Sequence, residues 1–470
     1  SEMLRKLLNS RCSFFLYAMK EGDHMKHYEE RVKETRKSIR KHLLEQIFHE
    51  FDVETLRLSE EGRQEKYRKM VESPFRFFRG SAYLFYFDHA NMPSPYHTAE
   101  DAPIWIQGDL HMDNFGAFQN ENGDIVYDIN DFDEGYIGSY LYDILRMSIS
   151  IVLYTEEEGY TNEEQNRFIR QYIEGYVKQL KRFVSGKDDP MTLIFTKDNT
   201  RGPIKRVLKK LEQRKENHLL QDITTVDEQG KRQFIESEEI ERVSEEEAAK
   251  IQAVANDYYS SLDERDQRTI TFYDLHDIVK KYGTGTASIG LKRYYALVEG
   301  ERDAAELEDL VLEIKEVRAA IPAYFLNYRE DFWKKYRHQG HRVVATQKAM
   351  HHLEDPYLGY LTIDDQQFYV RERSPYKKKV KQKHYKSVED YEKTLTIMGA
   401  ITAKNHSRAG IALNDIVPNE SEEEILDAIR DVEQFIDYVS LHAHYYATQV
   451  YEDYNIFAEN IVNGLFMKEK

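Results

Sequence analysis

The sequence predicts a mixed α+β fold, and three observations support this prediction. Apolar residues recur at helical spacing over long stretches, such as 29–58 and 140–184. The polar turn 119–123, with Asn122-Gly123, separates two short apolar runs and is typical of a β-hairpin. Further strand candidates gather between residues 276 and 375. Helices and strands therefore occupy separate parts of the chain.

Composition narrows the class of protein. The 470 residues are 41% hydrophobic and 32% charged, which is typical of a soluble globular protein. The formal net charge is 66 − 84 = −18, which argues against nucleic acid or an anionic membrane as a partner. The single cysteine, Cys12, excludes an intrachain disulfide framework. No secretory or membrane-spanning segment is evident, so we expect a cytoplasmic location.

In the first half of the chain, the helix predicted over 29–58 is followed by an aromatic and basic stretch over 74–80. Ile104-Trp105-Ile106 is a short strand candidate that leads into Gly108-Asp109. The predicted hairpin pairs 115–118 with 125–129, and helical spacing continues to about Val184.

The second half begins with a charged insertion over 204–270. It contains a second hairpin at 227–230 and a charged helix from about Glu238. A Gly-rich loop at 283–290 precedes strand candidates, and a lysine-dense loop separates these from the closing helices. The segments are two strands at 293–298 and 310–315, helices to about 353, a hairpin at 360–371, the lysine-dense loop at 376–386 and two final helices.

The strongest chemical signal is the run from Gly108 to Asn114, GDLHMDN, with Asp131-Phe132-Asp133 following 17 positions after Asn114. The intervening hairpin would bring the two segments together. Carboxylates and amides are the ligands that Mg²⁺ prefers, and phosphoryl transfer needs one carboxylate to orient a hydroxyl as well as metal ligands. Asp and Asn also cap turns, but the pairing of the two motifs favours the metal site.

The run resembles the catalytic loop of aminoglycoside and choline kinase-like phosphotransferases, which reads Gly-Asp-Leu-His, two residues, Asn. Asp131 matches their metal-binding Asp, and Tyr142-Asp143-Ile144 matches the Tyr-Asp-hydrophobic signature of the following helix. Together with Phe77-Phe78-Arg79-Gly80, the segments 108–116 and 130–134 resemble a large bacterial family of unknown function near the protein-kinase-like superfamily. This likeness covers most of the chain.

The resemblance implies a role for each matching residue. Asp109 would be the catalytic carboxylate, and Asn114 and Asp131 would be metal ligands. Asp133 is a further candidate, for a second metal or a water. His111 and Asp143 would support the catalytic loop rather than take part in the chemistry.

A kinase-like fold needs a nucleotide lobe, and the sequence places it after the catalytic loop. The candidate phosphate-binding residues are Gly283, Gly285 and Gly290 in the Gly-rich loop, and Lys315 on a strand 25 positions after Gly290. The expected fold is therefore a protein-kinase-like bilobal fold that is circularly permuted. The expected segments are a helical extension (1–100), the catalytic segment (101–200), a charged insertion with helices (201–275), the nucleotide lobe (276–375) and C-terminal helices that complete the large lobe (376–470).

For several residues the sequence leaves two interpretations open. For the carboxylate that pairs with Lys315, Glu330 fits by spacing, whereas Glu316 should face the opposite side of the strand. Arg79 reaches a phosphate or stacks at the edge of the core. The lysine-dense loop binds an anionic ligand or, as we favour from sequence, is a solvated loop. His351-His352 and His442-x-His444 have no carboxylate partner at a recognised metal spacing.

The leading functional hypothesis is an ATP- and Mg²⁺-dependent phosphotransferase that acts on an unidentified, small-molecule hydroxyl. A metal-dependent phosphoesterase is the alternative, because Asp109-Leu110-His111 fits an Asp-x-His metal motif, although the later motifs of that class are missing. A nucleotide-binding pseudokinase or a nucleotidyl transferase is the third possibility. The expected partners are a nucleotide and a small acceptor, without nucleic acid or membrane.

Overall fold

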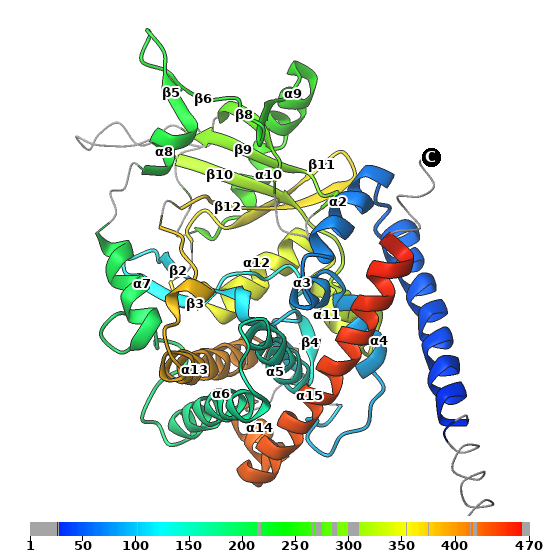
Figure 1. Cartoon of the computed structure of the whole chain (residues 1–470). Coiled ribbons are helices and arrows are strands. Elements are labelled where there is room, and N and C mark those ends of the chain that lie inside the picture. The colour runs from blue at the N-terminus through cyan, green and yellow to red at the C-terminus, as the bar shows by residue number, and fades with distance from the viewer. Residues whose placement is uncertain are drawn as a thin grey trace, which may run out of the picture.

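The computed structural model describes residues 26, 28–100, 102–213, 218–264, 267, 275–283, 289–298, 310–353, 355–374, 376–413, 415–416 and 421–462. The mixed α+β prediction is confirmed. A six-stranded antiparallel sheet lies above a body of helices, and short β-strands lie between the two parts (Figure 1).

The N-terminal segment is helical, as predicted. A helix over 28–48 continues into the π-helix η1 (His49–Thr55) and is followed by α2 (Glu60–Met70), α3 (Pro74–Gly80) and α4 (Ala82–His89). Ser59 and Ser73 cap α2 and α3 by accepting backbone N–H groups. Aromatic residues of these helices share one core with the C-terminal helix, so both ends of the described chain pack against the same body.

The predicted hairpin is confirmed as β2 (Phe115–Gln119) paired with β3 (Ile125–Ile129), and Phe115 lies opposite Ile129. The strand predicted at 104–106 is β1 (Ile104–Ile106), which pairs with β4 (Tyr136–Gly138). The short 3₁₀ helix η2 (Met112–Asn114) joins the catalytic run to β2. The pairing of these strands brings the two motifs together.

The helical body consists of α5 (Leu141–Glu156), α6 (Asn162–Val184), α7 (Gly202–Glu212), α13 (Val388–Ala412), α14 (Ser421–Ile429), α15 (Val432–Ile456) and η8 (Phe457–Val462). The helix α13 packs along α6, and α15 packs on α5, although more than 200 residues separate the partners in sequence (Figure 1). Three α-helices follow the lysine-dense segment in the described chain, so the prediction of two was wrong.

The sheet has the order β11-β12-β10-β9-β8-β7. Its strands are β7 (Ile240–Arg242), β8 (Leu275–Lys281), β9 (Arg293–Val298), β10 (Leu310–Glu316), β11 (Gly359–Ile363) and β12 (Gln366–Glu372). Leu312 and Ile314 of β10 lie in a small core with α9 (Glu245–Ala253) and α10 (Ala255–Ser261). Glu313 and Lys315, which alternate with these two residues along the strand, point to the opposite face.

Part of the charged insertion belongs to this sheet. Its hairpin is confirmed as β5 (Thr224–Val226) with β6 (Arg232–Phe234), preceded by α8 (His218–Ile223). The predicted charged helix begins at Glu245 rather than at Glu238, because residues 240–242 pair with β8. Local charge gave no sign of this long-range pairing.

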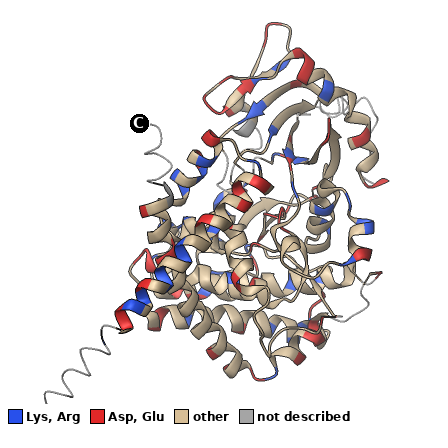
Figure 2. Cartoon of the chain, turned by 90° about the vertical axis from the view of Figure 1, so that its right-hand side faces the viewer, with Lys and Arg blue, Asp and Glu red and all other residues tan. Residues whose placement is uncertain are grey.

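Between the sheet and the body lie η6 (Ile321–Tyr324), α11 (Glu330–Lys335), α12 (Gln339–Met350) and η7 (Gln382–His384). Charged residues of both signs are dispersed over the outer helices (Figure 2). Within the described residues, none of the helices has both the length and the apolar composition that a membrane span requires.

Candidate functional site

The loop that carries the catalytic run is fixed by a buried carboxylate. Asp143 of α5 accepts the backbone N–H groups of Gln107 and Gly108, at 2.7 and 2.9 Å. Gly108 has φ of +88°, and an added Cβ would lie 2.1 Å from the carbonyl oxygen of Glu134. Only glycine fits this turn, and the two hydrogen bonds hold it in place.

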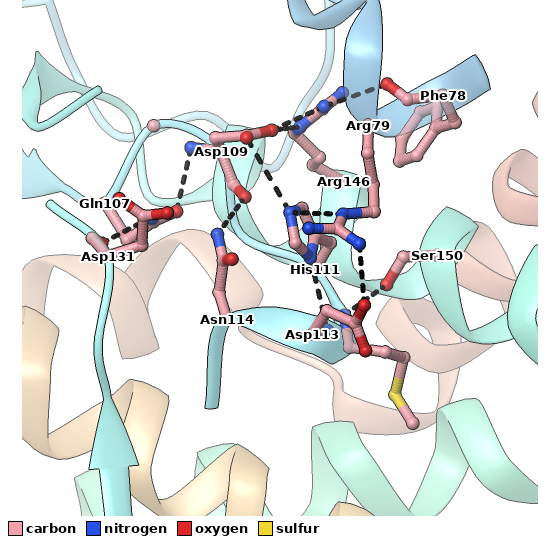
Figure 3. Close-up of polar contacts among 12 residues, drawn as sticks. Phe78, Arg79, Gln107, Asp109, His111, Asp113, Asn114, Asp131, Arg146 and Ser150 are labelled. Carbon is pink, nitrogen blue, oxygen red and sulfur yellow. Dashed lines mark hydrogen bonds and ion pairs between the residues drawn. The ribbon is translucent and has the colours of Figure 1, made fainter. Parts of the chain in front are cut away.

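Asp109 is held by an arginine of the adjacent helix. Nε of Arg146 donates to Oδ1 of Asp109 at 2.6 Å, and Arg146 is fully buried (Figure 3). Burial raises the pKa of Asp109, the nearby Arg146 lowers it and Asp131 raises it, with a net upward shift. The backbone N–H of Asp109 donates to Oε1 of Gln107, whose Nε2 donates to the carbonyl oxygen of Asp131 at 2.8 Å. Gln107 thus joins the two motifs.

His111 and Arg79 form a second support of the loop. Nδ1 of His111 lies 3.2 Å from the backbone nitrogen of Asp113, and Nε2 of the same ring lies 3.3 Å from Nε of Arg79. The neutral ring has one lone pair, so it accepts a hydrogen bond from one of these two donors at a time. Arg79 also pairs with Asp113 at 2.6 Å. Burial, then the charge of Arg79, hold the pKa of His111 well below its usual value. Arg79 thus contacts the loop directly, and its guanidinium lies near the ring of Phe75.

Asn114 forms hydrogen bonds with both motifs. Its Nδ2 donates to the backbone carbonyl of Asp109 at 2.8 Å, and its own carbonyl accepts the N–H of Asn130. Asn114 is buried and does not line the adjacent cavity. This hydrogen bond uses Nδ2 and leaves Oδ1, the atom that a metal ion would bind, so the role of Asn114 as a metal ligand stays a prediction.

Four carboxylates from the two motifs line one small cavity of about 80 Å³, here called the catalytic cavity. Its wall contains Asp109, Asp131, Asp133 and Glu134. Three cationic residues line the same cavity, Lys66 and Arg79 from the N-terminal helices and Arg318 from the segment after β10. The N-terminal extension therefore forms one wall of the candidate site.

Lys315 of β10 forms an ion pair with Asp133, a residue 182 positions earlier. Burial lowers the pKa of Lys315, but Asp133, Tyr369 and Asp131 together raise it, with a net upward shift. Of the carboxylates considered from sequence, Glu330 pairs with Lys334 on the surface, and Glu316 accepts the N–H of Lys292. Neither is the partner of Lys315 in the structure, because the tertiary fold brings the carboxylate from the other motif.

The Gly-rich loop is described only at its ends. Gly283 lies beside Glu239 and Gly290 lies beside Leu58, and Gly285 falls outside the described residues. Leu291, directly after the loop, lines the catalytic cavity. The exit of the loop is therefore close to the two carboxylate motifs.

The residues present fit a magnesium ion that is completed by its ligand. Within the ranges that the structure describes, His, Cys, Asp and Glu side chains do not form a group of three or more that could hold a metal ion. However, Oδ1 of Asp133 is buried without a hydrogen-bond partner, and exposed Asp131 lines the same cavity. Mg²⁺ commonly binds one or two carboxylates and takes its other ligands from water and phosphate.

The lysine-dense segment is packed against the hairpin, so its interpretation as a solvated loop was wrong. The backbone of Lys378 exchanges hydrogen bonds with Ala117 of β2, and Val380 is buried. Nζ of Lys379 donates to the backbone carbonyl of Asp113 at 2.6 Å. The lysine count suggested solvent exposure, but the backbone pairing with β2 determines the position.

Sequence reasoning missed Arg146, Gln107 and Glu134. Arg146 and Asp143 interrupt an otherwise apolar helix, and this interruption was a signal that they have buried partners. Gln107 had no such signal. Burial raises the pKa of Glu134 to about 7, despite the N–H of Ile321 that its carboxylate accepts.

Comparison with known proteins gives one match. Residues 57–460 match the family described as "uncharacterized protein conserved in bacteria (DUF2252)". The match spans most of the sequence, and the chain belongs to this family. No curated protein and no solved structure matches the chain.

Proposed function

We propose that this member of the DUF2252 family is an ATP- and Mg²⁺-dependent phosphotransferase with a circularly permuted kinase-like fold and a small-molecule hydroxyl as acceptor. The observation that carries the proposal is the ion pair between Lys315 and Asp133. It joins a lysine on a late β-strand to the carboxylate motif that follows the catalytic run.

The position of the sheet supports the permuted order. The polar side of β10 faces the two motifs, and the apolar side is covered by α9 and α10. The helices α13 and α15 complete the body by packing on α6 and α5. A sheet that follows its catalytic segment in sequence but lies above it in space is the arrangement that a permuted kinase-like chain requires.

The residues of the catalytic cavity suit transfer of a phosphoryl group. In this proposal Asp109 orients the acceptor hydroxyl and takes its proton as the oxygen bonds to the γ-phosphorus and the bond to the leaving ADP breaks. Arg146 keeps the Asp109 carboxylate in one orientation. Lys315 neutralises phosphate charge when a nucleotide separates it from Asp133.

The carboxylates of Asp131 and Asp133 would hold Mg²⁺, which neutralises charge on the phosphate oxygens when bound. Asp109 remains outside this pair because Arg146 already occupies Oδ1. The three carboxylates are thus divided between proton transfer and cation binding.

A thermal unfolding experiment with ATP and MgCl₂ tests the proposal. We expect the Tm of the wild-type chain to rise, and Asp131→Ala to abolish the rise. Asp437→Asn, an exposed change on α15, is the matched control and should keep the response. An unchanged wild-type Tm at millimolar ATP and Mg²⁺ would contradict the proposal. Label from the γ-phosphate rather than the α-phosphate of ATP should reach the product, which distinguishes phosphoryl from nucleotidyl transfer.

A further inference from the structure

A second and larger cavity, of about 630 Å³, lies beside the catalytic cavity. Its volume is in the range that binds small organic ligands. Asn130 and Phe132 line this second cavity, whereas Asp131 and Asp133 line the catalytic cavity. One extended segment therefore forms a wall of both.

Cationic side chains crowd one end of the second cavity around a single carboxylate. Arg371 donates to Glu313 at 2.7 Å, and Arg293 pairs with its other oxygen at 3.2 Å. Arg373 and Lys377 line the same cavity. Burial raises the pKa of Glu313, but these four cations outweigh burial and hold that pKa far below its usual value. Asp133 of the catalytic cavity, which is paired with Lys315, also acts electrostatically on Arg371. The four cations therefore share Glu313 and part of the charge of Asp133.

Lys377 is the least compensated of these cations. Within the described chain, no carboxylate lies within ion-pair distance of its Nζ. The adjacent charge of Arg371 and then burial lower its pKa far below the usual value for lysine. A partly buried ammonium group among guanidinium groups is costly unless an anion joins it. The position is therefore suited to an anionic ligand.

Aromatic rings also line the second cavity, and one of them is an imidazole with a free acceptor nitrogen. The ring of His351 stacks on Phe118 and meets Phe132 edge-on, with centroid distances of 5.0 and 4.8 Å. Nε2 of His351 donates to the carbonyl of Ile129 at 2.7 Å, so Nδ1 carries the lone pair in the neutral ring. This Nδ1 is buried without a hydrogen-bond partner in the described chain. A buried acceptor of this kind is suited to a hydrogen bond from a ligand hydroxyl.

Acidic residues also line the second cavity. The N–H of Glu372 donates to Asp355 at 2.6 Å. Burial, then the charge of Asp355, raises the pKa of Glu372. Glu121 is exposed at the hairpin turn. Of the carboxylates that line this cavity, Glu313 is the one with ion pairs to the arginine cluster in the described chain.

We propose that the second cavity binds a phosphate ester, with the phosphate held by Arg371, Arg373 and Lys377 and a hydroxyl of the same ligand donating to Nδ1 of His351. The shared chemistry fits a phosphorylated sugar or a nucleotide. This site lies beyond the phosphotransferase proposal, because it does not use Asp109, Asp131 or bound magnesium.

Calorimetry without Mg²⁺ tests this site with ribose 5-phosphate, ribose, AMP and adenosine as probes. We expect ribose 5-phosphate to bind and ribose to bind at least about tenfold more weakly, since charged hydrogen bonds are lost. Lys377→Gln should lose this preference, and Lys377→Arg should keep it. Lys383→Gln makes the same change at an exposed position of the lysine-dense segment and should bind as the wild type. Tighter binding of AMP than of ribose 5-phosphate would identify a nucleotide as the ligand, and the reverse order a phosphorylated sugar.

Folding of the variant is measured independently. Lys377→Gln removes an uncompensated cation, so its Tm without ligand should equal or exceed that of the wild type. Equal affinity for ribose and ribose 5-phosphate, no binding of either phosphate ester, or full affinity in Lys377→Gln would overturn the proposal. Loss of ribose 5-phosphate binding in Asp131→Ala would also overturn it, because the phosphate would then lie in the catalytic cavity.

Discussion

The two cavities that share the segment 130–133 are lined by equal numbers of charged residues, four carboxylates and three cations each, but these residues are arranged differently. In the catalytic cavity the carboxylates come from the two motifs, whereas in the second cavity the cations surround Glu313. Because side chains alternate along an extended chain, neighbouring residues of one segment line different cavities. The difference indicates that the two cavities bind different ligands, or different parts of one ligand.

Asp109→Asn should break the chemistry of the catalytic cavity and leave the second cavity intact. Loss of a general base typically lowers turnover by roughly 10²–10⁴-fold. ATP turnover with purified protein measures the effect, and ribose 5-phosphate binding should stay unchanged. Turnover equal to that of the wild type would remove Asp109 from the mechanism.

Arg146→Met tests how much the buried ion pair with Asp109 contributes to the stability of the chain. The change leaves Asp109 buried without its cation, and breaking a buried pair costs about 3–5 kcal/mol of unfolding free energy. Urea unfolding measures this loss. Arg170→Met breaks a surface pair with Glu433 and should cost about 0–1 kcal/mol. Similar losses of unfolding free energy in the two variants would show that the buried pair stabilises the chain no more than a surface pair does.

Gly108→Ala should disturb the contact between the two motifs. The positive φ alone disfavours alanine by roughly 1–2 kcal/mol, and the added Cβ must displace the carbonyl of Glu134. We expect a lower Tm together with weaker binding of ATP and Mg²⁺. Gly159→Ala, at a positive φ but in open space, reports the backbone strain alone. An equal effect of the two substitutions would argue against the close contact.

Glu134 makes the stability of the folded chain depend on pH. The pKa of Glu134 is about 7 in the folded chain, above its ordinary value of 4.5, so the folded state holds this proton more tightly. Stability from this group is therefore present at low pH and falls as pH rises from about 4.5 to about 7. Relative to Glu134→Gln, the wild type should lose Tm across this window. A constant difference between the two would contradict the shifted pKa.

Local sequence patterns were sufficient for the elements that bring the two motifs together. The turn at 119–123 predicted the hairpin, and the adjoining motifs located Asp109 and Asp131 near each other. Alternation in β10 also predicted that Glu316 faces away from Lys315. These features depend on residues close in sequence, where backbone periodicity is informative.

Long-range contacts were beyond local patterns. Nothing near Lys315 identified Asp133 as its partner, and nothing near Lys378 indicated its pairing with Ala117. Such contacts follow from the packing of the sheet on the body, which no single segment encodes.

The affinity of ATP with Mg²⁺ for Lys315→Ala tests most directly whether the late sheet is a nucleotide lobe. Calorimetry should show at least about tenfold weaker binding than in the wild type, because a charged hydrogen bond to phosphate is lost. Lys383→Ala should bind as the wild type does. Because Lys315 is ion-paired, circular dichroism must first show that the variant is folded. Wild-type affinity in folded Lys315→Ala would contradict the permuted kinase-like account.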